Sequence, residues 1–195
     1  YLRVFPNITF LAPGDGPELA AMLDFAVAHN GPVAIRYPKT NAPTLGLSEQ
    51  PIEFGRGQIL RWGTDGAILA LGPMLEQAIA AAELLAKEGL EISVINPRFI
   101  KPLDEELLAR VFAECRFVIS AEEATLMGGF GSAVSELAID RRWDTRNFRR
   151  LGIPDHFVEH GERDELLEEF SLNTAGLVQT CQELAARSAV QPVIG

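Results

Sequence analysis

The residues best suited to binding chemistry stand together at Arg36 and Tyr37. They end a short apolar segment with the sequence Gly31-Pro-Val-Ala-Ile-Arg-Tyr-Pro38. Because Pro38 has no amide hydrogen to donate, we expect a strand over 32–37 with Arg36 and Tyr37 at its carboxyl end. Ligands of open α/β sheets bind at that end, and a planar guanidinium suits a phosphate or a carboxylate. A salt bridge at the edge of the sheet explains the pattern equally well, so the residues alone leave both interpretations open.

Asp15 belongs to a second candidate site. Gly14-Asp15-Gly16, with Asn41 downstream, resembles the motif in which an aspartate and an asparagine bind the magnesium of thiamine diphosphate. Pro13 and Pro17 bracket Asp15 as the start of a helix, and one asparagine stands where the motif has a pair. We therefore interpret Asp15 as a helix cap and expect no metal site there.

Two further segments carry groups that could act on a ligand. Glu122 and Glu123 end an apolar run and could form an acid–base pair. Neighbouring residues of a strand point to opposite faces, however, so a structural role is favoured. The glycine-rich turn over 127–132 precedes a helix and could present amides to an anion. It lacks the spacing of the common phosphate loops, so tight packing is the favoured interpretation.

The histidines and cysteines do not indicate a catalytic or metal site. His29 lies at the end of a predicted helix, where a cap suffices. His156 and His160 have the spacing of two zinc ligands, but the segment reads as a loop without a third ligand nearby. Cys115 and Cys181 fit buried thiols of a reducing cytosol better than a disulfide framework.

Composition narrows the class of protein. Of the 195 residues, 47% are hydrophobic, which is enough for a packed core, and the net charge of −10 argues against nucleic-acid partners. The apolar stretches are shorter than the ~20 residues of a membrane span, so we expect a cytoplasmic chain. Tyr1 stands where an initiator methionine would be, and this predicts that the chain is part of a longer protein.

The elements that position these residues alternate between strand and helix patterns. Residues 4–5 read as a strand, and a strand, a helix and a strand over 8–37 predict a parallel pair. The segment 57–71 reads as a hairpin around Gly63–Gly66, and 74–87 as an amphipathic helix. The remaining predictions are strands at 91–95, 117–121 and 151–153, with helices at 104–112, 131–139, 164–170 and 174–186. This alternation predicts a mostly parallel sheet covered on both faces.

Several stretches together resemble the C-terminal part of the 1-deoxy-D-xylulose-5-phosphate synthases, which are thiamine diphosphate enzymes of the transketolase superfamily. Their order and spacing carry the resemblance over nearly the whole chain. The markers are the segments 1–7, 12–15, 31–38, 96–104, 122–133 and 152–155.

The resemblance implies an α/β fold with a three-layer, mostly parallel sheet. It assigns residues 1–39 to the end of a pyrimidine-binding domain, 40–53 to a linker and 54–195 to the transketolase C-terminal domain. Synthases of this family condense pyruvate with glyceraldehyde 3-phosphate and release carbon dioxide. Their Arg-Tyr-Pro arginine binds the phosphate of the aldehyde, which here is Arg36, with Tyr37 as a wall of the pocket. Lys39-Thr40 replaces the arginine and glycine usual in the family, so the shape of this loop stays open.

The family's cofactor and catalytic residues precede the position of Tyr1. The resemblance therefore implies thiamine diphosphate and Mg²⁺ in a full-length homodimer, with no cofactor, metal or turnover on this chain alone. Two other classes stay open at this point. One is another superfamily enzyme, such as a pyruvate dehydrogenase beta subunit or a transketolase, and the other is a non-catalytic assembly or regulatory module.

Overall fold

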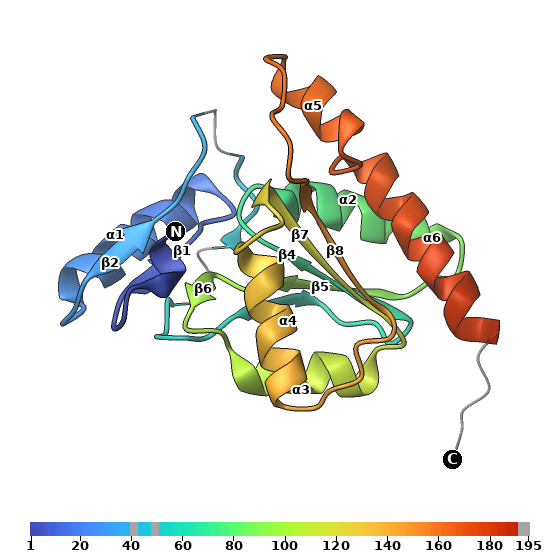
Figure 1. Cartoon of the computed structure of the whole chain (residues 1–195), viewed down its shortest axis with the longest axis horizontal. Coiled ribbons are helices and arrows are strands. Elements are labelled where there is room, and N and C mark those ends of the chain that lie inside the picture. The colour runs from blue at the N-terminus through green and yellow to red at the C-terminus, as the bar shows by residue number, and fades with distance from the viewer. Residues whose placement is uncertain (40–42, 48–50, 191–195) are drawn as a thin grey trace.

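The computed structural model describes residues 1–39, 43–47 and 51–190. Asn41, Thr40 and part of the predicted linker lie outside this range. The chain forms two sheets of unequal size (Figure 1). The smaller sheet has the strand order β2-β1-β6 and the larger has β3-β5-β4-β7-β8.

The larger sheet is the centre of the fold. Its strands β4, β5, β7 and β8 run parallel, and β3 is antiparallel at one edge. The strands are β3 (Gln58–Arg61), β4 (Gly66–Ala70), β5 (Ile92–Asn96), β7 (Val118–Thr125) and β8 (Phe148–Ile153). All residues of β4 and β5 are buried, as expected for central strands covered on both faces.

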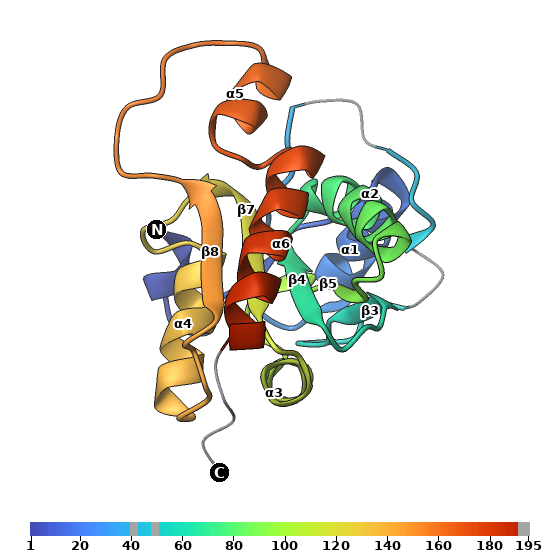
Figure 2. The same cartoon turned by 90° about the vertical axis from the view of Figure 1, so that its right-hand side faces the viewer.

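Helices cover both faces of this sheet, which gives three layers. Alternate residues of β4 face opposite sides, so Ile68 packs with α2 and α6 whereas Leu69 packs with α3 and α4. Figure 2 shows α6 lying along one face, with α4 on the far side of β8. The helices are α2 (Met74–Lys87), α3 (Glu105–Glu114), α4 (Phe130–Asp140), α5 (Arg163–Glu169) and α6 (Thr174–Val190). The expected three-layer α/β fold is confirmed.

The smaller sheet carries the N-terminal elements. Strands β1 (Thr9–Leu11) and β2 (Val33–Ile35) pair in parallel around α1 (Gly16–Ala28), as predicted. Strand β6 (Phe99–Lys101) adds to β1 in the antiparallel direction. Because β6 follows β5 directly in the sequence, this pairing attaches the N-terminal unit to the larger sheet.

Two predictions about strands are wrong. Residues 4–5 do not form a strand, because Leu2–Val4 is a short 3₁₀ helix. The predicted hairpin over 57–71 does not form either, since β5 lies between β3 and β4. The connection over 62–65 crosses the start of β5, where the Asp65 amide donates to the Glu91 carbonyl at 3.0 Å. Crossing one strand requires only about 10 Å, which four extended residues span.

Candidate functional site

Arg36 lies at the carboxyl end of β2, as expected from the sequence. Its amide donates to the carbonyl of Leu11 at 2.9 Å, which continues the parallel pairing of β1 and β2 by one residue. Pro38 then turns the chain away from the sheet. The guanidinium is consequently held at the strand end where ligands bind in sheets of this kind.

Arg36 is partly buried, and the negative charges of two glutamates of β7 act on its guanidinium. Burial lowers the pKa of Arg36, whereas the negative charges of Glu122 and Glu123 raise it. Within the described residues, Arg36 forms no side-chain hydrogen bond and no ion pair. Its donors therefore have no side-chain or carbonyl acceptor in this part of the chain.

The carboxylate of Glu122 bonds to the start of a helix rather than to Arg36. Its two carboxylate oxygens accept the amides of Phe130 at 2.8 Å and Gly131 at 2.7 Å, at the start of α4. Burial raises the pKa of Glu122, while these amides and the charge of Arg36 oppose that rise. Because a β-carbon on Gly129 would lie 2.4 Å from a Glu122 oxygen, the glycine lets the turn approach the carboxylate. The favoured interpretation of the glycine-rich turn, tight packing, is confirmed.

Glu123 points to a different partner. Nε of Arg163 donates to Oε1 of Glu123 at 2.9 Å, and Nη2 donates to Oε2 at 2.7 Å. This two-pronged pair joins the end of β7 to the start of α5. The two glutamates thus have separate structural partners and do not form an acid–base pair, as the alternation along the strand indicated.

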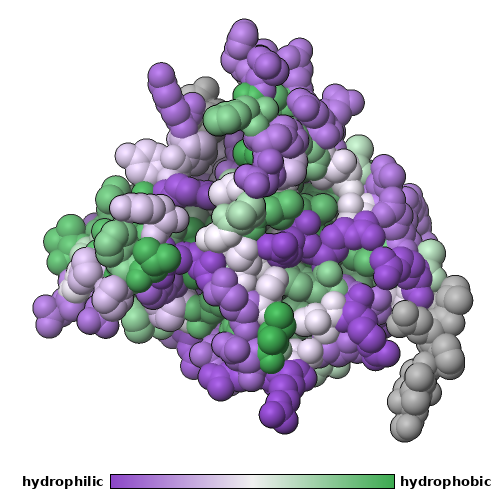
Figure 3. Space-filling view, viewed as in Figure 1, coloured by the Kyte–Doolittle hydropathy of each residue, from purple (hydrophilic) through white to green (hydrophobic). Residues whose placement is uncertain are grey.

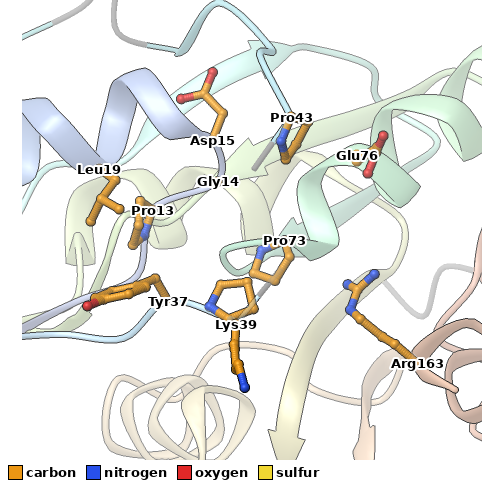
Figure 4. A pocket seen from close by; sticks show the side chains of 11 residues that line it. Pro13, Gly14, Asp15, Leu19, Tyr37, Lys39, Pro43, Pro73, Glu76 and Arg163 are labelled. Carbon is orange, nitrogen blue, oxygen red and sulfur yellow. The ribbon is translucent and has the colours of Figure 1, made fainter. Parts of the chain in front are cut away.

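A cavity of about 850 Å³ opens beside the end of β2. Figure 4 shows Tyr37 and Arg163 on opposite sides of it, with Pro13 and Pro73 between them. A second cavity of about 380 Å³ adjoins it and shares Pro38, Lys39 and Arg163 in its lining. Tyr37 is among the lining residues of the larger cavity and is 62% exposed. Arg36 is not among the residues that line these two cavities.

Asp15 is the cap of α1. Its Oδ1 accepts the amide of Glu18 at 2.7 Å, and its Oδ2 accepts the amides of Leu45 at 2.8 Å and Leu47 at 3.3 Å. Through these three bonds, the carboxylate of Asp15 holds the start of α1 and the loop that contains Leu45 and Leu47. The structural role predicted for Asp15 is confirmed.

The described residues contain no group of three or more His, Cys, Asp or Glu side chains that could hold a metal ion. His29 ends α1 and stacks against Phe25 and Phe54. Both cysteines are buried and unpaired, and burial raises the pKa of Cys181 to about 12. Among the helices of this part of the chain, none is long and apolar enough to cross a membrane.

A second charged cluster, around Glu18 and Arg98, was missed from the sequence. Glu18 is fully buried and accepts from Nε of Arg98 at 2.8 Å and from the amide of Gly14 at 2.8 Å. Asn96 also donates to this carboxylate, at 2.9 Å. The cluster joins α1 to the turn between β5 and β6. The two charged residues lie 80 positions apart, so no local pattern connects them.

Comparison with known proteins places these features in a family. The family model for the transketolase C-terminal domain matches residues 55–177. The 1-deoxy-D-xylulose-5-phosphate synthase of Rhodopirellula baltica is 48% identical over 191 residues, covering 98% of this chain and 30% of that protein. The synthase of Symbiobacterium thermophilum is 45% identical over 96% of this chain and 29% of its own length. The chain thus spans about 30% of the length of the curated relatives it matches.

Solved structures agree with the family assignment. A split-gene transketolase, described as an inactive beta4 tetramer, superposes with a TM-score of 0.85 at 33% identity, covering 94% of this chain and 59% of that one. A transketolase of Pichia stipitis gives a TM-score of 0.74 at 21% identity, over 96% of this chain and 26% of its own, and this likeness concerns the fold alone. The resemblance to the C-terminal part of the synthases, stated from the sequence, is confirmed.

Proposed function

Because this chain belongs to the family of transketolase C-terminal domains, we propose that it serves as the C-terminal portion of an enzyme that condenses pyruvate with glyceraldehyde 3-phosphate and releases carbon dioxide. The observation that carries the proposal is the 48% identity to a named synthase over almost the entire chain. The transketolase structure of Pichia stipitis, at 21% identity, shows a shared fold and does not bear on the reaction. The product of the proposed reaction is a precursor of isoprenoids, thiamine and pyridoxal.

Arg36 is the residue of this chain that we assign to the substrate. Its guanidinium binds the phosphate of glyceraldehyde 3-phosphate, and Tyr37 forms a wall of the pocket. The position at the end of β2 and the absence of side-chain partners among the described residues support this assignment. A guanidinium–phosphate contact contributes about 1.5–3 kcal/mol.

The cofactor of the proposed reaction is thiamine diphosphate with Mg²⁺, bound outside this chain. The described residues do not fit a magnesium site, because no cluster of carboxylates is present and both oxygens of Asp15 are used by backbone amides. Thiamine diphosphate supplies the carbanion chemistry, and this chain contributes acceptor binding. We divide the chain into the end of a pyrimidine-binding domain over 1–39, a linker over 40–53 and a C-terminal domain over 54–195.

The complete enzyme is proposed to be a cytoplasmic homodimer. Figure 3 shows hydrophobic side chains gathered on the left of the molecule, over the N-terminal unit. Val4 is 77% exposed and Val27 on α1 is 90% exposed, so this surface suits burial against another part of the assembly. Sedimentation of the complete enzyme at twice the mass of one chain is the expected result.

An assay of acceptor specificity tests the proposed reaction. The complete enzyme that contains this chain is supplied with pyruvate and either glyceraldehyde 3-phosphate or no acceptor, and carbon dioxide release is measured. We expect release that depends on the aldehyde, and no turnover by the isolated chain freed of the complete enzyme. Transfer from a ketose phosphate in place of pyruvate would instead identify a transketolase.

A further inference from the structure

The loop over 154–162, which joins β8 to α5, carries a phenylalanine that stands in solvent. Phe157 is 104% exposed, the largest exposed fraction of the large hydrophobic residues in the described part of the chain. Figure 2 shows the loop standing clear of the body of the molecule before it enters α5. Single exposed hydrophobic residues are common on protein surfaces, so exposure by itself does not indicate a partner. The restraints on the loop and its position add to this observation.

Contacts on both sides of Phe157 restrain the loop. The ring of His156 lies 5.8 Å from the ring of Phe170, at the end of α5. Arg163, the first residue of α5, donates from Nη2 to Oε2 of Glu123 at 2.7 Å and so ties the end of the loop to β7. A backbone restrained in this way loses less conformational entropy on binding, and an aromatic side chain on it suits an interface anchor.

The loop borders the cavities of the candidate site. Val158 and Gly161 line the smaller cavity together with Pro38 and Lys39. Pro38 and Lys39 follow Arg36 closely at the end of β2, and they also line the larger cavity. A part of the enzyme that covers these cavities therefore also meets the loop over 154–162.

The proposed reaction determines which part of the enzyme covers the cavities. This chain spans about 30% of the length of its curated relatives, and the cofactor is proposed to bind outside it. Glyceraldehyde 3-phosphate is only three carbons long, so its reacting carbon lies a few bond lengths from the phosphate that we assign to Arg36. The cofactor-bearing portion must consequently close over the end of β2 and come up against the loop.

The charges of the loop indicate the chemistry of the surface that receives it. Asp155, Glu159 and Glu162 are exposed and form no ion pair within the described residues. These three carboxylates lie on both sides of Phe157 in the sequence. An apolar pocket with lysine or arginine at its rim is complementary to such a loop.

We propose that the loop over 154–162 is a docking surface for the cofactor-bearing portion of the complete enzyme. Phe157 is the anchor, which enters an apolar pocket with a basic rim on that portion. The inference rests on the proposed function, because the acceptor site at the end of β2 determines which portion covers the loop.

Hydrogen exchange of the complete enzyme, measured by mass spectrometry of its peptides, tests the docking surface. The wild type is compared with Phe157→Ala in the absence of substrate. Burial of a phenylalanine shifts an equilibrium by at least a factor of ten, so the loop and one segment outside this chain should both exchange about tenfold faster in the variant. A phenylalanine that stays in solvent predicts no change outside the loop.

Ile139→Ala is the matched control. Ile139 is also a large exposed hydrophobic residue, at 68%, but it lies near the carboxyl end of α4, at the opposite end of the larger sheet. Its substitution should leave the exchange of the loop and of the outside segment unchanged. Glu159→Lys provides a second route that keeps Phe157 in place. It puts a cation against the basic rim, so the same two segments should exchange faster, most clearly at low salt.

The outcomes separate this inference from the proposed function. Unchanged exchange outside this chain in Phe157→Ala, or an equal change in Ile139→Ala, overturns the docking surface. Acceleration confined to this chain's own residues would mean that a second copy of the same portion covers Phe157, which also overturns the proposal. If carbon dioxide release still depends on the aldehyde in these cases, the proposed function stands. Faster exchange of both segments in an enzyme whose release does not depend on the aldehyde supports the docking surface and contradicts the proposed reaction.

Discussion

Arg36 and Arg98 are both shielded from solvent, but their guanidinium groups differ in their hydrogen-bond partners. Arg98 is 2% exposed, and its guanidinium donates to Glu18, Gln58 and the carbonyls of Leu47 and Pro51. Arg36 is partly buried and has no side-chain hydrogen bond within the described residues. A buried guanidinium whose donors are used stabilises the fold, whereas one whose donors are left open can bind a ligand.

The surroundings of the two arginines account for this difference. Glu18 approaches Arg98 directly, since Asn96 and the amide of Gly14 hold its carboxylate in place beside the guanidinium. At the end of β7, Glu122 accepts the amides of α4 and Glu123 accepts from Arg163, and neither carboxylate bonds to Arg36. The two arginines therefore differ in whether a carboxylate is hydrogen-bonded to the guanidinium.

The largest effect is expected from breaking the Glu18–Arg98 pair. Arg98→Met leaves the buried carboxylate of Glu18 without its cation, and we expect the free energy of unfolding to fall by about 3–5 kcal/mol. Urea unfolding of this chain measures the change. Arg149→Met removes an exposed pair and should change stability by about 0–1 kcal/mol. Equal losses in the two variants would show that the Arg98 cluster does not stabilise the fold.

The second-largest loss of stability is expected in the turn whose amides bond to Glu122. A β-carbon on Gly129 would lie 2.5 Å from the carbonyl of Thr125 as well as 2.4 Å from the Glu122 carboxylate. We expect Gly129→Ala to lower the free energy of unfolding by about 1–3 kcal/mol, because the turn must move. Gly161→Ala is the control, since its nearest neighbour lies 3.5 Å away, in ordinary contact. A Gly129→Ala variant as stable as Gly161→Ala would contradict the close packing of turn and carboxylate.

Arg36→Ala should affect stability much less than Arg98→Met does. Because Arg36 has no hydrogen bond to lose within the described residues, we expect the free energy of unfolding to change by less than about 1 kcal/mol. The same urea titration measures it. A loss as large as that of Arg98→Met would mean that Arg36 is a structural cation, and the contrast between the two arginines would fail.

The smallest effect is a pH dependence from Glu122. Burial raises the pKa of Glu122 in the folded chain, so the folded state holds this proton more tightly than the unfolded state does. Between the ordinary glutamate pKa of about 4.3 and the raised value, the free energy of unfolding should therefore fall as pH rises. Glu122→Gln should remove this part of the slope in urea titrations from pH 4 upward. An identical slope in both proteins would mean that another group titrates.

The sequence predicted the helices and the central strands well because their signals are local. The helix over 74–87 was predicted with the bounds that α2 has, since its apolar residues recur at helical spacing. The cap formed by Asp15 was also predicted, because it is a contact with a residue three positions away. The position of Arg36 at a strand end followed from Pro38 alone.

The missed features depend on partners far apart in the sequence. Strand β6 has three residues and pairs with β1 near the start of the chain, so it has no periodicity of its own. The false hairpin arose because a glycine-bounded turn looks the same whether or not a strand lies between its arms. The bonds of Arg98 and of Arg163 join residues 80 and 40 positions apart, and no spacing rule connects such pairs.

The most direct test of the account compares two aldehydes. The complete enzyme and its Arg36→Ala variant are assayed with glyceraldehyde 3-phosphate and with unphosphorylated glyceraldehyde, at saturating pyruvate. If Arg36 binds the phosphate, the variant should lose about 10–150-fold in kcat/KM for the phosphorylated aldehyde and little for the other. An equal loss for both aldehydes, or no loss for either, would contradict the assignment of Arg36 to the phosphate.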